Sequence, residues 1–133
     1  MISITFDHHA ELIALAKALE FVKFRCHDPE CSHLAGSPYI GNLYRNVLTS
    51  LEPYYKRSHT QWSASNIAIE DSSYALDAVR YHITTVSNWH RLDVKTKLKA
   101  LTEYLNPLCF KEETLFALME FGDNYHEVDR QDS

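Results

Sequence analysis

The chain has 133 residues, of which 45% are hydrophobic and 23% are charged. These proportions are typical of a globular domain and exclude a disordered, collagen-like or low-complexity chain. The formal net charge of -5 lacks the basic character that nonspecific nucleic-acid binding requires.

The first quarter of the sequence predicts a short strand followed by a long helix. Apolar and polar side chains alternate in residues 2–6 and again in 65–70, which is the pattern of half-buried strands. We therefore expect these two segments to pair as a small two-stranded accessory. Asp7 is expected to cap a helix that runs to Lys23 or Arg25.

A second helix is expected after a polar turn that covers residues 25–36. Ser37 and Pro38 supply a capping side chain and a first-turn proline, the usual start of a helix. Apolar residues then recur at helical spacing as far as Leu51. Pro53 predicts a kink or interruption, because proline lacks a backbone donor and crowds the preceding turn.

Three further helices are predicted in the second half of the chain. The first begins at Ser72 or the residue before it, and the second is capped by Asp93 and ended by Pro107. The last covers residues 111–121 and is expected to end at Gly122.

The sequence thus predicts a mainly α fold of about five helices packed as an irregular bundle. Residues 1–122 are interpreted as a single domain, since no linker or internal repeat divides them. Residues 123–133 are interpreted as an acidic, flexible C-terminal tail.

The sequence also indicates a cellular location. No segment has the roughly 20 apolar residues of a membrane span. Asp7 to Glu11 stand where a secretory signal would be basic and then apolar. We therefore expect a cytoplasmic protein that does not enter membranes and whose three cysteines are thiols.

Residues 26–33 contain the densest group of side chains that bind metals. Cys26, Cys31 and His33 are ligand types that zinc prefers. The candidates for a fourth ligand are His8, His9 and Cys109. Zinc ligands normally come as two spaced pairs, and the second pair is missing here. We therefore expect no cofactor, with zinc as the alternative.

The dipeptide His27-Asp28 resembles the paired His-Asp of helical metal-dependent phosphohydrolases. That resemblance implies further metal ligands, for which the candidates are His8, His9, Asp71, Asp77 and Asp93. In that family the pair lies within a helical scaffold, whereas here Pro29 follows at once. The sequence contains no Gly-x-Ser-x-Gly nucleophile motif and no complete catalytic set.

A group of aromatic side chains surrounds the predicted helix break. Tyr54, Tyr55 and Trp62 lie close to Arg57 in a stretch where burial is hard to guarantee. Tyrosine, tryptophan and arginine are the residues that most often anchor protein interfaces. These four residues are the predicted recognition surface.

These observations favour a small cytoplasmic binding protein of the immunity, antitoxin, inhibitor or adaptor type over an enzyme. Such a protein acts by stoichiometric binding to a protein partner, and a homo-oligomer is compatible with the same features. The alternative is a metal-binding helical domain, or a small metal-dependent hydrolase, built on residues 26–33.

Overall fold

The computed structural model describes residues 3–132, most of which lie in six α-helices. The helices are α1 (His9–Phe24), α2 (Pro29–Ala35), α3 (Pro38–Tyr55), α4 (Ser73–Thr84), α5 (Val94–Leu105) and α6 (Glu112–Asp132). Three short 3-10 helices lie between them, namely η1 (Ala64–Asn66), η2 (Ile69–Asp71) and η3 (Trp89–Arg91). The predicted mainly α architecture is confirmed.

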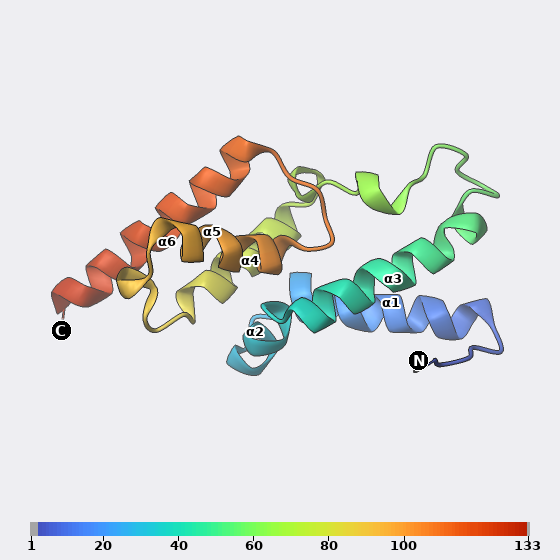
Figure 1. The fold of residues 1–133 in the computed structure, drawn as a ribbon, viewed down its shortest axis with the longest axis horizontal. Coiled ribbons are helices and arrows are strands. Elements are labelled where there is room, and N and C mark those ends of the chain that lie inside the picture. Colours follow the sequence, from blue (N-terminus) through green and yellow to red (C-terminus); the bar gives the residue numbers. More distant parts are fainter. Residues whose placement is uncertain (1–2, 133) are drawn as a thin grey trace.

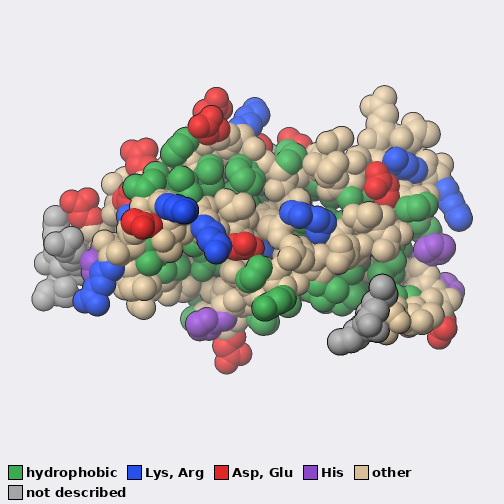
Figure 2. Space-filling view, viewed as in Figure 1, with side chains coloured by type: hydrophobic (Ala, Val, Ile, Leu, Met, Phe, Trp, Pro, Cys, Tyr) green, Lys and Arg blue, Asp and Glu red, His purple; other side chains and the backbone are tan. Residues whose placement is uncertain are grey.

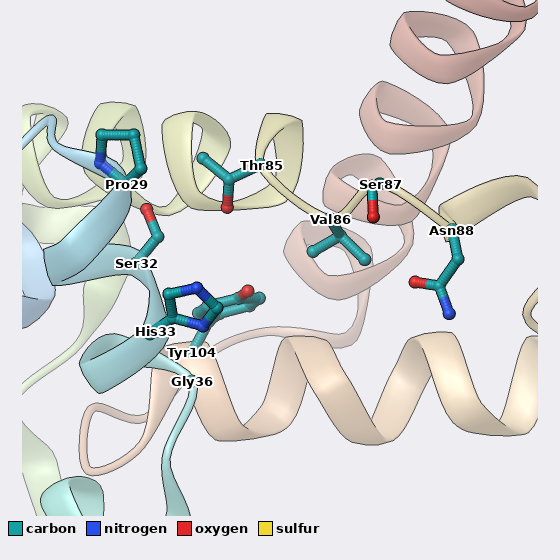
Figure 3. Close-up of a pocket in the computed structure, with 9 residues that line it drawn as sticks. All are labelled: Pro29, Ser32, His33, Gly36, Thr85, Val86, Ser87, Asn88 and Tyr104. Carbon is teal, nitrogen blue, oxygen red and sulfur yellow. The ribbon is translucent and has the colours of Figure 1, made fainter.

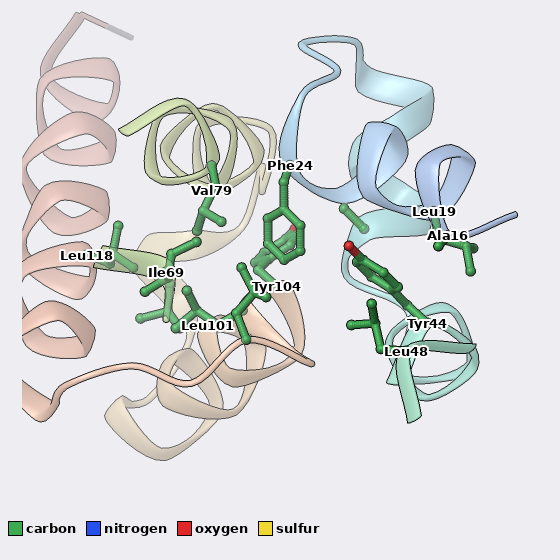
Figure 4. Packing of buried hydrophobic residues seen from close by; sticks show 14 of the residues in the cluster. Ala16, Leu19, Phe24, Tyr44, Leu48, Ile69, Val79, Leu101, Tyr104 and Leu118 are labelled. Carbon is green, nitrogen blue, oxygen red and sulfur yellow. The ribbon is translucent and has the colours of Figure 1, made fainter. Parts of the chain in front are cut away.

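The helices form two neighbouring groups, with α1 to α3 at one end of the molecule and α4 to α6 at the other (Figure 1). α1 joins the groups because it packs against α3, α2 and α4. A single hydrophobic cluster passes through both groups. Phe24 lies in the middle of this cluster, between Tyr44 and Tyr104 (Figure 4).

Three helix starts lie where local capping signals predict them. Ser37 caps α3 by accepting a hydrogen bond from the amide of Tyr39 at 3.2 Å. Ser72 caps α4 through the amide of Ala75 at 3.3 Å. Asp93 likewise caps α5. Each cap satisfies an amide that has no partner within its own helix.

One feature of the predicted N-terminal half was wrong. The cap of α1 is His8 rather than Asp7, and its Nδ1 accepts from the amide of Ala10. At Pro53, where a kink or an interruption was predicted, α3 is not interrupted and continues to Tyr55. Proline at this position removes one helix bond to the carbonyl four residues earlier, and only Tyr54 and Tyr55 follow it in α3.

α2 lies within residues 25–36, where the sequence predicts only a polar turn, so that expectation was also wrong. Asp28 caps α2 by accepting from the amide of Glu30 at 2.9 Å, and Pro29 occupies the first position. Asp-Pro-Glu is itself a helix-start signal, with a cap, a preset first dihedral angle and an acidic first turn.

The predicted pairing of residues 2–6 with 65–70 is not formed in the part of the chain that the structure describes. Residues 3–6 are exposed, residue 2 lies outside the described residues, and 65–70 overlaps η1 and η2 in place of a strand. The backbone of Ile67 and Ile69 bonds instead to Cys109, with both distances at 2.9 Å. A distant segment therefore supplies the partners that the N-terminus was expected to supply.

α6 continues through Gly122 to Asp132, so the predicted helix end at Gly122 was wrong. A Cβ atom at Gly122 would lie 2.7 Å from the ring of Trp89 and 2.8 Å from Ile83. The glycine therefore allows α6 to pack closely on two buried side chains and does not end the helix. The backbone of residues 123–132, expected as a flexible tail, belongs to α6.

Lys23 is fully buried where α1, α2 and α5 meet. Its Nζ donates to the carbonyl of Ala35 at 2.6 Å and to that of Glu103 at 2.9 Å. Both carbonyls lie in the last turn of a helix, where backbone acceptors have no partner of their own. Either protonation state of the amine carries the two N–H groups required. Lys23, on α1, thus supplies hydrogen-bond donors to the C-terminal ends of α2 and α5.

Two buried histidines close helix ends in the same way. Nε2 of His82, on α4, lies 2.9 Å from the carbonyl of Lys23 in the last turn of α1. Nε2 of His126, on α6, lies 2.9 Å from the carbonyl of Ile83 in the last turn of α4. A carbonyl can only accept, so Nε2 carries the proton in both rings. In α1, α2, α4 and α5, a carbonyl of the last turn therefore accepts a hydrogen bond from a side chain of another helix.

The burial of Lys23 predicts that stability rises with pH. Burial lowers the pKa of Lys23 to about 7 from its ordinary 10.5, and the charge of Glu103 raises it only in part. Above pH 7 the unfolded chain keeps a proton that the folded chain has lost. The free energy of unfolding should therefore rise by up to about 1.4 kcal/mol per pH unit. Urea unfolding between about pH 7 and 8.5 measures this slope.

Lys23→Met should remove that slope, because methionine keeps much of the side-chain length but has no titratable group. It should also lower stability by about 1–3 kcal/mol for each carbonyl left without a donor. Lys17→Met, at an exposed position of α1, is the matched control and should keep the slope. Parallel pH profiles for wild type and Lys23→Met would show that Lys23 does not titrate in this range.

Candidate functional site

A polar cleft of about 390 Å³ lies between α2, the segment that follows α4, and α5 (Figure 3). Its lining residues are Pro29, Ser32, His33, Gly36, Thr85, Val86, Ser87, Asn88 and Tyr104. Hydroxyl, imidazole and amide groups supply its polarity, and none of the nine is an acid, a lysine or an arginine. The cleft can offer hydrogen bonds without a fixed charge.

Ser32 and His82 form a close pair at the wall of this cleft. Oγ of Ser32 lies 2.7 Å from Nδ1 of His82, and because Nε2 carries the proton, the serine hydroxyl donates. The ring of Tyr104 stacks on the imidazole at 5.6 Å. Burial lowers the pKa of His82 to about 4, which keeps the ring neutral at pH 7.

A hydroxyl bonded to a neutral imidazole is the arrangement that activates a serine nucleophile. A nucleophile must also reach its substrate, and only 3% of the surface of Ser32 is exposed while His82 has none. The amide and hydroxyl of Ser32 both face groups of the fold, since the amide bonds to the carbonyl of Asp28. The geometry therefore fits a buried polar group that is satisfied internally.

A second cavity, of about 230 Å³, lies between α1, α3, α4 and the loop that follows α3. It is lined by Glu20, Phe24, Tyr44, Leu48, Tyr55, Trp62, Ile67, Ala68, Ser72, Tyr74, Ala75 and Leu108. Five of these side chains are aromatic, and we refer to this space as the aromatic cavity. Rings from α1, α3, α4 and the loop that follows α3 meet there.

The structure brings the predicted recognition residues together next to this cavity. Ring centroids of Tyr54 and Tyr55 are 5.5 Å apart, and those of Tyr55 and Trp62 are 4.8 Å apart. His9 extends the row, with its ring 4.9 Å from that of Tyr54. The three predicted aromatic residues are half-buried, and Arg57 is exposed beside them. We call Tyr54, Tyr55, Arg57 and Trp62 the aromatic end.

Glu20 supplies a carboxylate to the aromatic cavity. Its Oε1 accepts from Nε of Arg25 at 2.9 Å and from the hydroxyl of Tyr74 at 3.0 Å. The guanidinium of Arg25 also lies 4.1 Å from the centre of the Tyr74 ring. Burial raises the pKa of Tyr44, and the charge of Glu20 adds to that effect, so this phenol stays neutral.

Glu20 and Tyr74 are site residues that the sequence does not indicate. They are 54 positions apart and meet only because α1 packs against α4. Glu20 lies on a helix of mixed composition, where a carboxylate ordinarily faces solvent. No local motif marks either residue, so only the packed structure identifies them.

The predicted zinc ligands are only partly assembled. Interaction with the Cys26 thiol, together with burial, raises the pKa of Cys31 to about 11. His33 lines the polar cleft. His8 and His9 lie at the opposite end of α1, about 24 Å along its axis, which is too far for a shared metal. Among the side chains that the structure describes, no three of ligand type are grouped to hold a metal ion.

Comparison with known proteins does not assign this chain to a family or a function. No protein family, no curated protein and no solved structure matches it. In the described part of the chain, no helix has the length and apolar character needed to cross a membrane. Acidic and basic side chains are mixed over the described part of the face in Figure 2, without one large patch of a single sign. The polar cleft and the aromatic cavity are therefore the two candidate sites.

The Ser32–His82 pair predicts that stability falls in mild acid. The ordinary pKa of histidine is 6.5 and that of His82 is about 4, so between these values only the unfolded chain binds the proton. The free energy of unfolding should therefore fall as the pH drops through this window, by about 3 kcal/mol for a shift of this size. Urea unfolding between about pH 4 and 7 measures the loss.

His82→Gln should be nearly free of this acid sensitivity, because its amide can still donate to the carbonyl of Lys23 but does not titrate. The matched control is His33→Gln, which changes an exposed imidazole in the neighbouring cleft. Equal acid sensitivity in wild type and His82→Gln would assign the effect to other groups.

Proposed function

We propose that this chain is a small cytoplasmic binding protein, of the immunity, antitoxin, inhibitor or adaptor type, that acts by stoichiometric binding to a protein partner. The aromatic end is the proposed contact surface. The observation that carries the proposal is the row of half-buried rings that leads from Tyr54 through Tyr55 to Trp62 and into the aromatic cavity.

Half-buried aromatic rings favour tight association. Each ring is already partly ordered by its neighbours, so binding costs less conformational entropy than it would for free side chains. The apolar area that remains exposed can still be buried by a partner. Arg57 lies next to the rings and is exposed, where it can pair with a carboxylate at the rim of an interface. The three free cysteines fit the reducing cytoplasm.

A second candidate function is metal binding near Cys26 and Cys31, favoured by the effect of the Cys26 thiol on the pKa of Cys31. Thiolates are preferred zinc ligands, but two of them need further ligands from outside the pair. Under this alternative, native mass spectrometry of untagged protein gives one zinc per chain, and Cys31→Ser loses it. A metal-free mass for the folded wild type would contradict metal binding.

The test of the main proposal begins with recovery of a partner from the source organism on immobilised protein. The partner is then purified, and its affinity and stoichiometry are measured by calorimetry. We expect one-to-one binding. Tyr54→Ala with Arg57→Ala should weaken it at least tenfold, because a few anchor residues supply most of the binding energy.

Tyr39→Ala is the matched control, because Tyr39 is a tyrosine at the other end of α3 with 83% of its surface exposed. This variant should bind the partner as wild type does. The double variant should also keep its melting temperature within a few degrees, about the effect of surface substitutions. Unchanged affinity in the stable double variant would exclude the aromatic end as the contact surface.

A further inference from the structure

We propose that the aromatic cavity receives one neutral aromatic side chain that carries an N–H or O–H donor, a tryptophan or a tyrosine of the protein partner. This inference rests on the proposed function and names the chemistry of the anchor. Three observations support it, namely the size of the cavity, the carboxylate at its wall and the cation that already neutralises this carboxylate.

The size of the cavity fits one side chain. Its volume of about 230 Å³ is smaller than the roughly 300–1,000 Å³ of pockets for cofactors and drug-sized ligands. Tyr55 and Trp62 line it with rings whose centroids are 4.8 Å apart. An inserted ring can pack against them in the tilted or offset geometry that aromatic groups prefer.

Glu20 favours an anchor with a hydrogen-bond donor. Its Oε1 accepts two bonds, from Arg25 and Tyr74, whereas a carboxylate has about four acceptor positions. An indole N–H or a phenol O–H that enters the cavity can donate a hydrogen bond to one of the remaining acceptor positions of Glu20. A bond to a charged acceptor is stronger than one between neutral groups. A phenylalanine would lack it.

Arg25 favours a neutral anchor over a cation. Its guanidinium pairs with Glu20 and lies 4.1 Å from the centre of the Tyr74 ring. The position that a lysine or arginine of the partner would take is therefore already occupied by a cation of this chain. A second positive charge would be repelled by Arg25, whereas a neutral donor is not.

The cavity is also continuous with the proposed contact surface. Tyr55 and Trp62 belong to the aromatic end, line the cavity and are half-buried. A partner that covers the aromatic end therefore lies directly over these two cavity residues. Interfaces of this kind place a central aromatic anchor in a pocket, with less important contacts around it.

The experiment titrates isotope-labelled full-length protein with N-acetyl-tryptophanamide and follows the indole N–H signals by nuclear magnetic resonance. The Trp62 signal should move in a saturable way. The Trp89 signal should not move, because Trp89 is fully buried and lies in η3, outside the cavity lining. N-acetyl-tyrosinamide should act similarly.

Two further probes test the chemistry. N-acetyl-phenylalaninamide, which has a ring without a donor, should bind about tenfold more weakly, the value of one hydrogen bond to a charged group. N-acetyl-argininamide should not compete. Equal binding of the phenylalanine probe, tighter binding of the arginine probe, or no movement of the Trp62 signal would each overturn the inference.

Two variants locate the site. Ala68→Leu should abolish probe binding by filling the cavity that Ala68 lines. Glu20→Gln should weaken the tryptophan probe about fivefold to tenfold, since the acceptor loses its charge. Glu52→Gln is the matched control, because Glu52 is a half-buried acid of α3 outside the cavity lining. Unchanged binding in either of the first two variants, with a native spectrum, would overturn the inference.

The probes act without the partner, so the inference and the proposed function can fail separately. If the probes bind but no protein partner is recovered, the proposed function fails and the cavity is a site for a free indole or phenol compound. If a partner binds at the aromatic end but the probes do not enter the cavity, the proposed function stands and the anchor inference fails.

Discussion

The buried amine of Lys23 is the interaction on which the arrangement of the helices depends. It bonds to the last turns of α2 and α5 from α1, and His82 of α4 bonds in turn to the carbonyl of Lys23. Four helices thus meet at one hydrogen-bonded centre. The desolvation of an amine is costly, and only the fixed positions of both acceptors offset it. This requirement selects one orientation for each helix end.

The polar centre and the aromatic end have different physical character. The centre has no exposed surface at Lys23 or His82, and every buried polar side-chain atom that the structure describes has a partner. The aromatic end leaves its rings half-buried around a cavity. A satisfied centre gives stability and specificity, whereas incompletely buried rings keep free energy available for association. The satisfied polar groups thus lie in the middle of the molecule and the half-buried rings at one end.

Sequence reasoning succeeded where the signal is local. Helix starts at Ser37, Ser72 and Asp93 depend on neighbouring amides, and all three were predicted. The signal for the start of α2 at Asp28 was also local. It was missed because the residues that follow have the polar composition of a turn. The same locality identified Tyr54, Tyr55 and Trp62 as a group, because they are close in sequence.

The features that sequence reasoning missed depend on distant partners. Gly122 was expected to end a helix, but its role is set by Trp89, which lies on another element. Glu20 meets Tyr74 only after α1 and α4 have packed together. Lys23 lies near the end of a predicted helix, and no residue near it in the sequence indicates that its amine bonds to two carbonyls. Such roles follow from tertiary packing, which overrides local preference.

The bond between Lys23 and the carbonyl of Glu103 has a consequence for how the chain folds. It joins residues 80 positions apart, so it can form only after α5 has returned to α1. Contacts of such large sequence separation are slow to form, because the chain must first lose loop entropy. A fragment that ends after α3 lacks the Glu103 acceptor, and one that begins at α4 lacks the donor. Neither fragment can form the complete set of hydrogen bonds around Lys23, which requires both parts of the chain.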